Sequence, residues 1–301
     1  MTTGKHLACV CTFFRNEGLL DAAESFFRAA NFADSDCVLV IVDSSLEGHA
    51  SKTAESLRAS HPKRVVYLEA TEPGLVSARN EALSFARSCQ ALSLAFIDDD
   101  QIVSLSWYKE IRQSAAEFPN AIIAGPVLPD PAGEFPAFDP SGNFWTRKYW
   151  SDKASITEPI GDGNVLFPKH FLNSTLVYDP QYNRSGAQDT DLFLQWLDLG
   201  NEIRWSSKAI VFEGISLERL SKSWALKRAH FSSLSYVMVE RKRGISHSRV
   251  IARVFKHFVI AVIYGLAAFE QKSRFRSQFH FAIMRGTLEG YLGQTVDRFA
   301  R

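Results

Sequence analysis

The stretch Leu94-Ala95-Phe96-Ile97-Asp98-Asp99-Asp100 joins four apolar residues directly to three adjacent carboxylates. An apolar run of this length, bounded by polar residues, is typical of a buried strand in a parallel sheet. Successive side chains alternate along an extended chain, so we expect Asp98 and Asp100 on one side and Asp99 on the other. Two carboxylates at the end of a buried strand are suitable ligands for Mg²⁺ or Mn²⁺. A solvated acidic turn is the alternative that this stretch alone leaves open.

Apolar segments with the length of strands alternate with segments of helical periodicity before this stretch. The expected strands cover residues 7–12, 37–42 and 65–68, and the expected helices cover 19–30, 51–60 and 74–88. This alternation predicts an α/β fold with a mostly parallel, Rossmann-like sheet flanked by helices. Ligands of such sheets bind beyond the carboxyl ends of the strands. Thr12 and Asp43 would therefore join the three aspartates at one edge of the sheet.

The chain of 301 residues is long enough for one large or two small domains, and its composition is that of a globular protein, with 46% hydrophobic and 22% charged residues. Its net charge of +1 conceals a strong asymmetry. Residues 1–218 contain 18 Lys or Arg and 29 Asp or Glu, whereas residues 219–301 contain 16 and 4. We therefore expect an α/β domain over 1–218 and a basic helical extension over 219–301 that meets an anionic partner.

The most apolar part of the extension is residues 250–269. Its uninterrupted core, residues 258–269, is too short to span a bilayer. A basic amphipathic helix lying on a membrane surface is one interpretation, and a helix packed on the α/β body is the other. Nucleic-acid binding is not expected, because no known nucleic-acid-binding module is present.

The four cysteines, at positions 9, 11, 37 and 89, lack the paired spacing of a zinc site. We expect free thiols in a reducing cytoplasm. Residues 1–5 do not begin a charged-then-apolar signal pattern, so secretion is not expected.

Five motifs, in order, give the chain a resemblance to the family-2 glycosyltransferases, which have the GT-A fold. They are Val10–Glu17, Val40–Ser45, Gly74–Asn80, Phe96–Asp100 and Gly186–Leu192. The resemblance extends over residues 6–235. The basic extension is most similar to that of bacterial members that build exopolysaccharides such as succinoglycan on a lipid carrier.

The resemblance implies a role for each matching residue. Asp98 and Asp100 would bind Mn²⁺ or Mg²⁺ as the family's Asp-x-Asp, with His230 as a third ligand. Asp189 would be the catalytic base, and the implied substrate contacts are Thr12, Arg15, Asp43, Arg79, Asp98, Gln188 and Arg228. Arg79 follows a glycine turn at a helix start, where an arginine can contact a phosphate or ribose. An exposed helix arginine, a loop-capping Asp43 and a helix-capping Asp189 are the structural alternatives.

Gln188 departs from the family pattern, which has Glu at this position. A neutral amide removes a like charge beside Asp189, so the basicity of Asp189 is not raised by that neighbour.

The expected activity is an inverting, metal-assisted transfer of a hexose from a nucleotide sugar, with UDP as the nucleotide that the resemblance favours. The acceptor would be a growing, lipid-linked glycan, and the protein would be cytoplasmic or peripheral on the inner face of the plasma membrane. A catalytically weak scaffold in a polysaccharide synthase complex is one alternative, and a nucleotidyltransferase is another. The chain lacks the glycine-rich loop that a nucleotidyltransferase has after its first strand, and it lacks the G-x-G-x-x-G of a dinucleotide oxidoreductase.

Overall fold

The computed structural model describes residues 4–35, 37–267 and 269–294, and these form two compact units. The first unit consists of residues up to Pro129 together with 147–183 and 191–214. The second consists of 130–146, 184–190 and the residues from 215 onward. The change of unit at 215 lies close to the expected boundary at 218. The second unit also includes two segments from the part of the chain that we expected to form the α/β domain.

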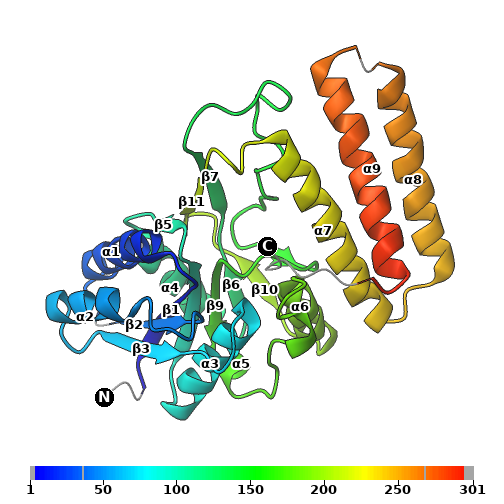
Figure 1. Ribbon diagram of the computed structural model, residues 1–301. Coiled ribbons are helices and arrows are strands. Elements are labelled where there is room, and N and C mark those ends of the chain that lie inside the picture. Colours follow the sequence, from blue (N-terminus) through cyan, green and yellow to red (C-terminus); the bar gives the residue numbers. More distant parts are fainter. Residues whose placement is uncertain (1–3, 36, 268, 295–301) are drawn as a thin grey trace. The chain divides into compact units, whose positions relative to one another are not determined.

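The strands and helices alternate through the first unit, as the apolar periodicity predicts (Figure 1). The strands are β1 His6–Thr12, β2 Val38–Asp43, β3 Val65–Glu69, β4 Ser93–Asp98, β5 Gln101–Val103, β6 Ile122–Ala124, β7 Val127–Pro131, β8 Ser155–Ile156, β9 Asn164–Pro168, β10 Ile203–Trp205 and β11 Val211–Ile215. The helices are α1 Asn16–Phe32, α2 Ser51–Ser60, α3 Leu75–Ser88, α4 Trp107–Glu117, α5 Lys169–Leu172, α6 Gln188–Asp198, α7 Lys222–Lys242, α8 His247–Leu266 and α9 Gln271–Tyr291, and a short 3₁₀ helix covers Pro180–Tyr182.

The main sheet has the strand order β3-β2-β1-β4-β9-β6-β10-β8. β3, β2, β1 and β4 are parallel to one another, whereas β9 is antiparallel to both β4 and β6. The mostly parallel sheet is therefore confirmed, with an antiparallel strand at its centre. A smaller sheet has the order β5-β11-β7.

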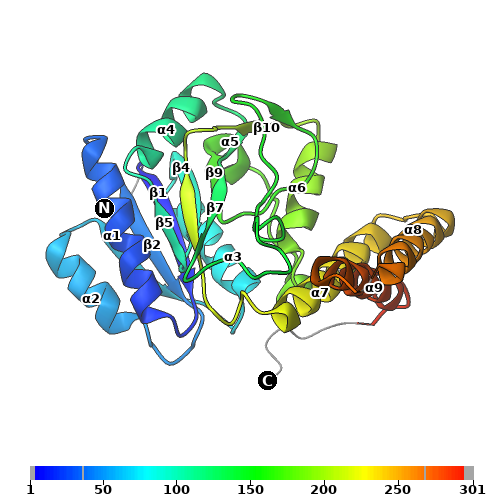
Figure 2. The same ribbon diagram turned by 90° about the horizontal axis from the view of Figure 1, so that it is seen from above.

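Helices cover both faces of the parallel part of the sheet. Figure 2 shows α1 and α2 on one face and α3 on the other, and α3 contacts β1, β2 and β4. The core on the α1 face is built from apolar residues with almost no exposure, including Phe26, Phe27 and Trp107. Burial of these side chains supplies the main stabilisation of the layers.

The strand register brings the predicted polar residues to one edge. Thr12 is opposite Asp43 on the neighbouring strand, and Cys11 is opposite Asp98. The carboxyl ends of β1, β2 and β4 therefore lie side by side, which confirms that Thr12, Asp43 and Asp98 share this edge.

The second unit is built around the three C-terminal helices, with α9 between α7 and α8 (Figure 1). Gly286 allows α9 to approach α7 closely, because a side chain at this position would meet the carbonyl of His230. A separate apolar cluster joins the 130–146 segment to these helices, with Phe138 and Trp145 near Ala225 and Phe275. Within the described residues, none of the helices is long and apolar enough to cross a membrane.

Candidate active site

The three aspartates do not continue the alternation of a strand. β4 ends at Asp98, and Asp99 and Asp100 lie in a turn before β5. Arg15 Nη1 donates to both Asp99 Oδ1 and Asp100 Oδ2, each at 3.0 Å. The expected division, with Asp99 opposite the other two, is therefore replaced by a pair of neighbours that shares one guanidinium, because the chain turns where the strand ends.

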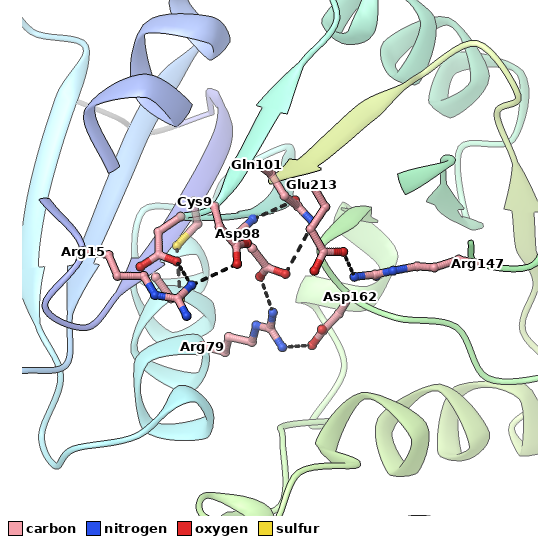
Figure 3. Close-up of polar contacts among 11 residues, drawn as sticks. Cys9, Arg15, Arg79, Asp98, Gln101, Arg147, Asp162 and Glu213 are labelled. Carbon is pink, nitrogen blue, oxygen red and sulfur yellow. Dashed lines mark hydrogen bonds and ion pairs between the residues drawn. The ribbon is translucent and has the colours of Figure 1, made fainter. Parts of the chain in front are cut away.

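Arg79 is the fifth residue of α3 and is only 2% exposed. Its Nη2 donates to Asp98 Oδ1 at 2.9 Å, and its Nη1 donates to Asp162 (Figure 3). Burial alone would lower the pKa of Arg79, but the carboxylates of Asp162 and Asp98 outweigh it and raise that pKa. The side chain is thus not an exposed helix arginine, and its observed partners are carboxylates. Its contact with a donor phosphate stays a prediction.

The amides at the start of α3 are also occupied by the protein. Asn183 Oδ1 accepts from the N–H groups of Val76 and Ser77, at 3.1 and 3.3 Å. The amides of a first turn are the groups that bind phosphate at many helix starts. In this structure an asparagine side chain takes that position.

Asp98 is held from several directions. Its N–H donates to Oε1 of the fully buried Gln101 at 2.9 Å, and its carboxylate faces Gly163. A side chain at Gly163 would meet Asp98 Oδ2 and Gln101 Nε2, so this position leaves no room for a Cβ. Asp98 therefore has a fixed orientation, although 33% of its side chain is exposed.

Asp99 is turned toward β1. Its Oδ2 accepts from the hydroxyl of Thr12 at 2.9 Å, and the side chain is largely buried. Burial raises the pKa of Asp99 to about 6, although Arg15 and the hydrogen bond from Thr12 oppose the shift. Thr12 and Arg15, both predicted to contact substrate, thus contact the triple aspartate.

Negative charge is concentrated around Asp98. Burial raises the pKa of Asp98, Arg79 opposes this effect, and the nearby carboxylates Asp100 and Glu213 raise it further. Arg147 also opposes the rise and forms an ion pair with Glu213 (Figure 3).

A divalent cation would favour the charged forms of Asp98 and Asp100, and their oxygens are the hard ligands that Mg²⁺ and Mn²⁺ prefer. Among the described residues, no group of three His, Cys, Asp or Glu side chains is already arranged to hold a metal ion. Two carboxylates fit a cation that takes its remaining ligands from water and a substrate phosphate.

Asp43 is completely buried at the end of β2. Its Oδ1 accepts from Ser45 N at 2.9 Å, and its Oδ2 accepts from Ala50 N at 2.8 Å and from the hydroxyl of Tyr67 at 3.1 Å. Burial acts to raise the pKa of Asp43, but these hydrogen bonds outweigh it and lower that pKa. The carboxylate holds the loop over 44–50 in place, as in the loop-capping alternative. Its contact with a nucleobase stays a prediction.

The other candidates belong to the second unit. Gln188 and Asp189 are the first two residues of α6. Asp189 Oδ1 accepts from the N–H of Thr190 at 2.8 Å. The preceding segment is tied to α7, because the hydroxyl of Ser235 donates to the carbonyl of Ser185 at 2.6 Å.

Arg228 and His230 lie on α7, and Arg228 is exposed. Nε2 of His230 lies 2.6 Å from Oε2 of Glu289 on α9, so this histidine joins two helices of the second unit. The structure gives His230 a carboxylate partner in place of the metal that the resemblance implies, and its role as a ligand stays a prediction.

Sequence reasoning missed four residues around Asp98: Gln101, Arg147, Asp162 and Glu213. Asp162 gave no distinct local signal, since Gly161-Asp162-Gly163 is also the composition of an ordinary turn. Gln101 lies only three residues after Asp98, whereas Arg147 and Glu213 are brought close to it by packing between distant parts of the chain.

Three comparisons relate this geometry to known proteins. The family model described as glycosyl transferase family 2 matches residues 8–169. Over 297 residues the chain is 26% identical to the succinoglycan biosynthesis protein ExoM of Rhizobium meliloti (strain 1021), covering 93% of this chain and 91% of that protein.

Two solved structures share the fold. The mannosyltransferase PcManGT of Pyrobaculum calidifontis, in complex with GDP-Man and Mn²⁺, has a TM-score of 0.66 and 13% identity, covering 97% of this chain and 88% of that one. GalNAc-T7 with UDP, GalNAc and Mn²⁺ has a TM-score of 0.55 and 12% identity, covering 81% of this chain and 52% of that one. Because the family model spans more than half of the sequence, the chain belongs to glycosyl transferase family 2 and is a glycosyltransferase with the GT-A fold.

Proposed function

We propose that the protein transfers a hexose from a nucleotide sugar, with UDP as the favoured nucleotide, to a growing lipid-linked glycan with inversion at the anomeric carbon. The observation that carries the proposal is the orientation of Asp98 at the carboxyl end of β4, where buried Arg79 and Gln101 fix it beside Asp100. A preorganised carboxylate pair at this edge suits the diphosphate of a donor bound through a divalent cation.

Asp98 and Asp100 would hold Mn²⁺ or Mg²⁺, which when bound neutralises charge on the departing diphosphate. This assignment is supported by the donor set and by the Mn²⁺ in the two related structures. Arg15, which is half-exposed and pairs with Asp99 and Asp100, is the cation of this cluster that can turn toward a phosphate. Thr12 fixes Asp99, so that the turn after β4 keeps its shape.

Asp189 is the proposed base. It would take the proton from the acceptor hydroxyl while the hydroxyl oxygen forms a bond to the anomeric carbon of the sugar. The bond from that carbon to the diphosphate oxygen breaks in the same displacement, and the nucleoside diphosphate leaves. Gln188 and Arg228 are proposed to bind substrate beside this base, and His230 to complete the metal site when substrate is present.

The lipid-linked acceptor is supported by the similarity to a succinoglycan biosynthesis protein and by the basic character of residues 219–301. An acceptor anchored in a bilayer requires the enzyme to work at a membrane surface. We accordingly place the protein on the cytoplasmic face of the plasma membrane, without nucleic acid as a partner.

Donor hydrolysis and transfer by the purified protein test this function. The panel contains UDP-, GDP- and dTDP-sugars with Mn²⁺, Mg²⁺ or EDTA, because the two related structures contain different nucleotides. We expect turnover of one donor that requires a divalent cation. Asp189→Asn should lower turnover by roughly a hundredfold or more while donor affinity is kept, and Asp198→Asn at the other end of α6 is the control. Donor binding without turnover in the wild type would instead indicate the scaffold that Gln188 allows.

A further inference from the structure

α8 has a continuous apolar stripe that nothing within the described chain covers. It consists of Ile251, Phe255, Phe258, Val259, Val262, Ile263 and Leu266, which are between 36% and 81% exposed. The spacing of three or four residues places all of them on one side of the helix. The opposite side, with Val250, His257 and Ala261, is the one packed in the helical unit.

The stripe is larger than the scattered apolar residues of an ordinary surface. Two phenylalanines and five aliphatic side chains follow one another over four turns, and Phe269 beyond the end of α8 is 82% exposed. A contiguous apolar surface of this kind marks a contact with a protein or a membrane.

The charge around the stripe identifies the partner. Residues 241–276 contain nine Lys or Arg and a single acidic residue, Glu270. Arg249 and Lys256 lie on α8 itself and are exposed, and Lys272 follows shortly after the helix. Long basic side chains at the border of an apolar face can extend toward anionic headgroups while the apolar residues enter the acyl region. A second copy of this chain would bring the same positive border against itself, which disfavours self-association through this face.

We infer that α8 lies flat on an anionic phospholipid bilayer, with the apolar stripe in the interface and the surrounding Lys and Arg side chains on the headgroups. The inference deepens the proposed function, because it identifies the surface through which the transferase would reach a lipid-linked acceptor. α8 binds without crossing the bilayer, in agreement with the absence of a sufficiently long apolar helix among the described residues.

Flotation of the full chain with lipid vesicles tests the inference without any sugar donor. The vesicles contain either phosphatidylcholine alone or an equal mixture of phosphatidylcholine and phosphatidylglycerol. We expect the protein to bind the anionic vesicles. Its affinity for the neutral vesicles should be lower by roughly tenfold or more.

The double variant Phe255→Gln/Ile263→Gln should lower the partition coefficient by roughly a hundredfold. The matched control is Leu105→Gln/Leu199→Gln, which changes two residues of the first unit that are 56% and 65% exposed, and it should bind like the wild type. Lys256→Gln/Arg249→Gln should weaken binding to anionic vesicles and leave the weak binding to neutral ones unchanged.

Three results would overturn the inference. The first is that the wild type does not bind vesicles, and the second is that Phe255→Gln/Ile263→Gln binds them as strongly as the wild type. The third is that the wild type forms a dimer in lipid-free solution and this variant does not. Mn²⁺-dependent nucleotide binding, measured on the same samples, shows whether each variant is folded. It also separates the two proposals, since vesicle binding without donor binding would contradict the transferase site alone.

Discussion

The guanidinium of Arg79 is buried against the carboxylate of Asp98, with Nη2 donating to Oδ1 at 2.9 Å. The other side of the guanidinium is bound by Asp162. A residue that the motif pattern assigns to the donor phosphate thus also orients the carboxylate that is proposed to bind the cation. Arg79 acts here as a positioning residue for Asp98.

Removing this guanidinium should destabilise the first unit. Arg79→Met leaves two carboxylates close together without their shared counter-ion, and we expect the free energy of unfolding to fall by about 3–5 kcal/mol. Urea unfolding measures the loss, and Arg58→Met, at an exposed position of α2, is the control. Arg79→Lys keeps the charge but not the two-sided contact, so it should fold and bind Mn²⁺ and nucleotide more weakly. Wild-type affinity in Arg79→Lys would exclude the positioning role.

Asp162 should be coupled to Asp98 through their common partner. Asp162→Asn keeps the size of the side chain but removes its charge, and we expect a loss of about 1–3 kcal/mol in the free energy of unfolding. In a double-mutant cycle with Asp98→Asn, the two losses should differ from additivity by about 0.5–3 kcal/mol. Strict additivity would show that Arg79 does not connect the two carboxylates.

Asp99 predicts a pH dependence of stability in metal-free protein. Its pKa of about 6 in the folded protein lies above the value of 3.8 expected for the unfolded chain. As the pH falls through 6, the folded protein takes up a proton that the unfolded chain does not, so the contribution of Asp99 to the free energy of unfolding rises until about pH 4. Asp99→Asn should lack this rise. If the free energies of unfolding of the wild type and Asp99→Asn change with pH in the same way from about pH 7 to about pH 4, the raised pKa of Asp99 is contradicted.

The pair of histidines between α8 and α9 should have the opposite effect on stability, lowering it as the pH falls. The Nδ1 atoms of His257 and His280 lie 2.8 Å apart. Burial lowers the pKa of both below 6.5, assisted by the positive charges of Lys256, Arg253 and Arg276. Protonation therefore favours the unfolded helices, and their stability should fall as the pH drops below 6.5.

Hydrogen exchange of α8 and α9 at about pH 7.5 and about pH 5.5, corrected for intrinsic rates, measures this change. His280→Gln should remove most of the pH dependence, whereas His61→Gln in the first unit should leave it intact. Equal protection of the wild-type helices at both pH values would show that folding does not lower the pKa of either histidine.

Local periodicity was sufficient for the helices of the first unit. The predicted bounds of 51–60 and 74–88 agree with α2 and, to within one residue, with α3, because the apolar spacing of each helix is contained in a short segment. The edge that gathers Thr12, Asp43 and Asp98 was also predictable, since parallel strands end on the same side. The four free cysteines agree with expectation as well.

Long-range pairing could not be predicted in the same way. β9 lies antiparallel between β4 and β6, which brings Asp162 and Gly163 to Asp98, yet nothing within residues 161–168 specifies those neighbours. The partner of Arg79 is likewise 83 positions away in the sequence. The 130–146 and 184–190 segments join the second unit through tertiary packing, which leaves no period in the sequence.

Calorimetric binding of UDP and UDP-sugars in the presence of Mn²⁺ or EDTA tests the central claim most directly, with Asp100→Asn compared to the wild type and Asp21→Asn, an exposed change on α1, as the control. The account predicts Mn²⁺-dependent binding to the wild type and to Asp21→Asn, and a loss of roughly a hundredfold or more in Asp100→Asn. Equal binding with Mn²⁺ and with EDTA, or an unchanged affinity in Asp100→Asn, would contradict a metal-assisted donor site at the end of β4.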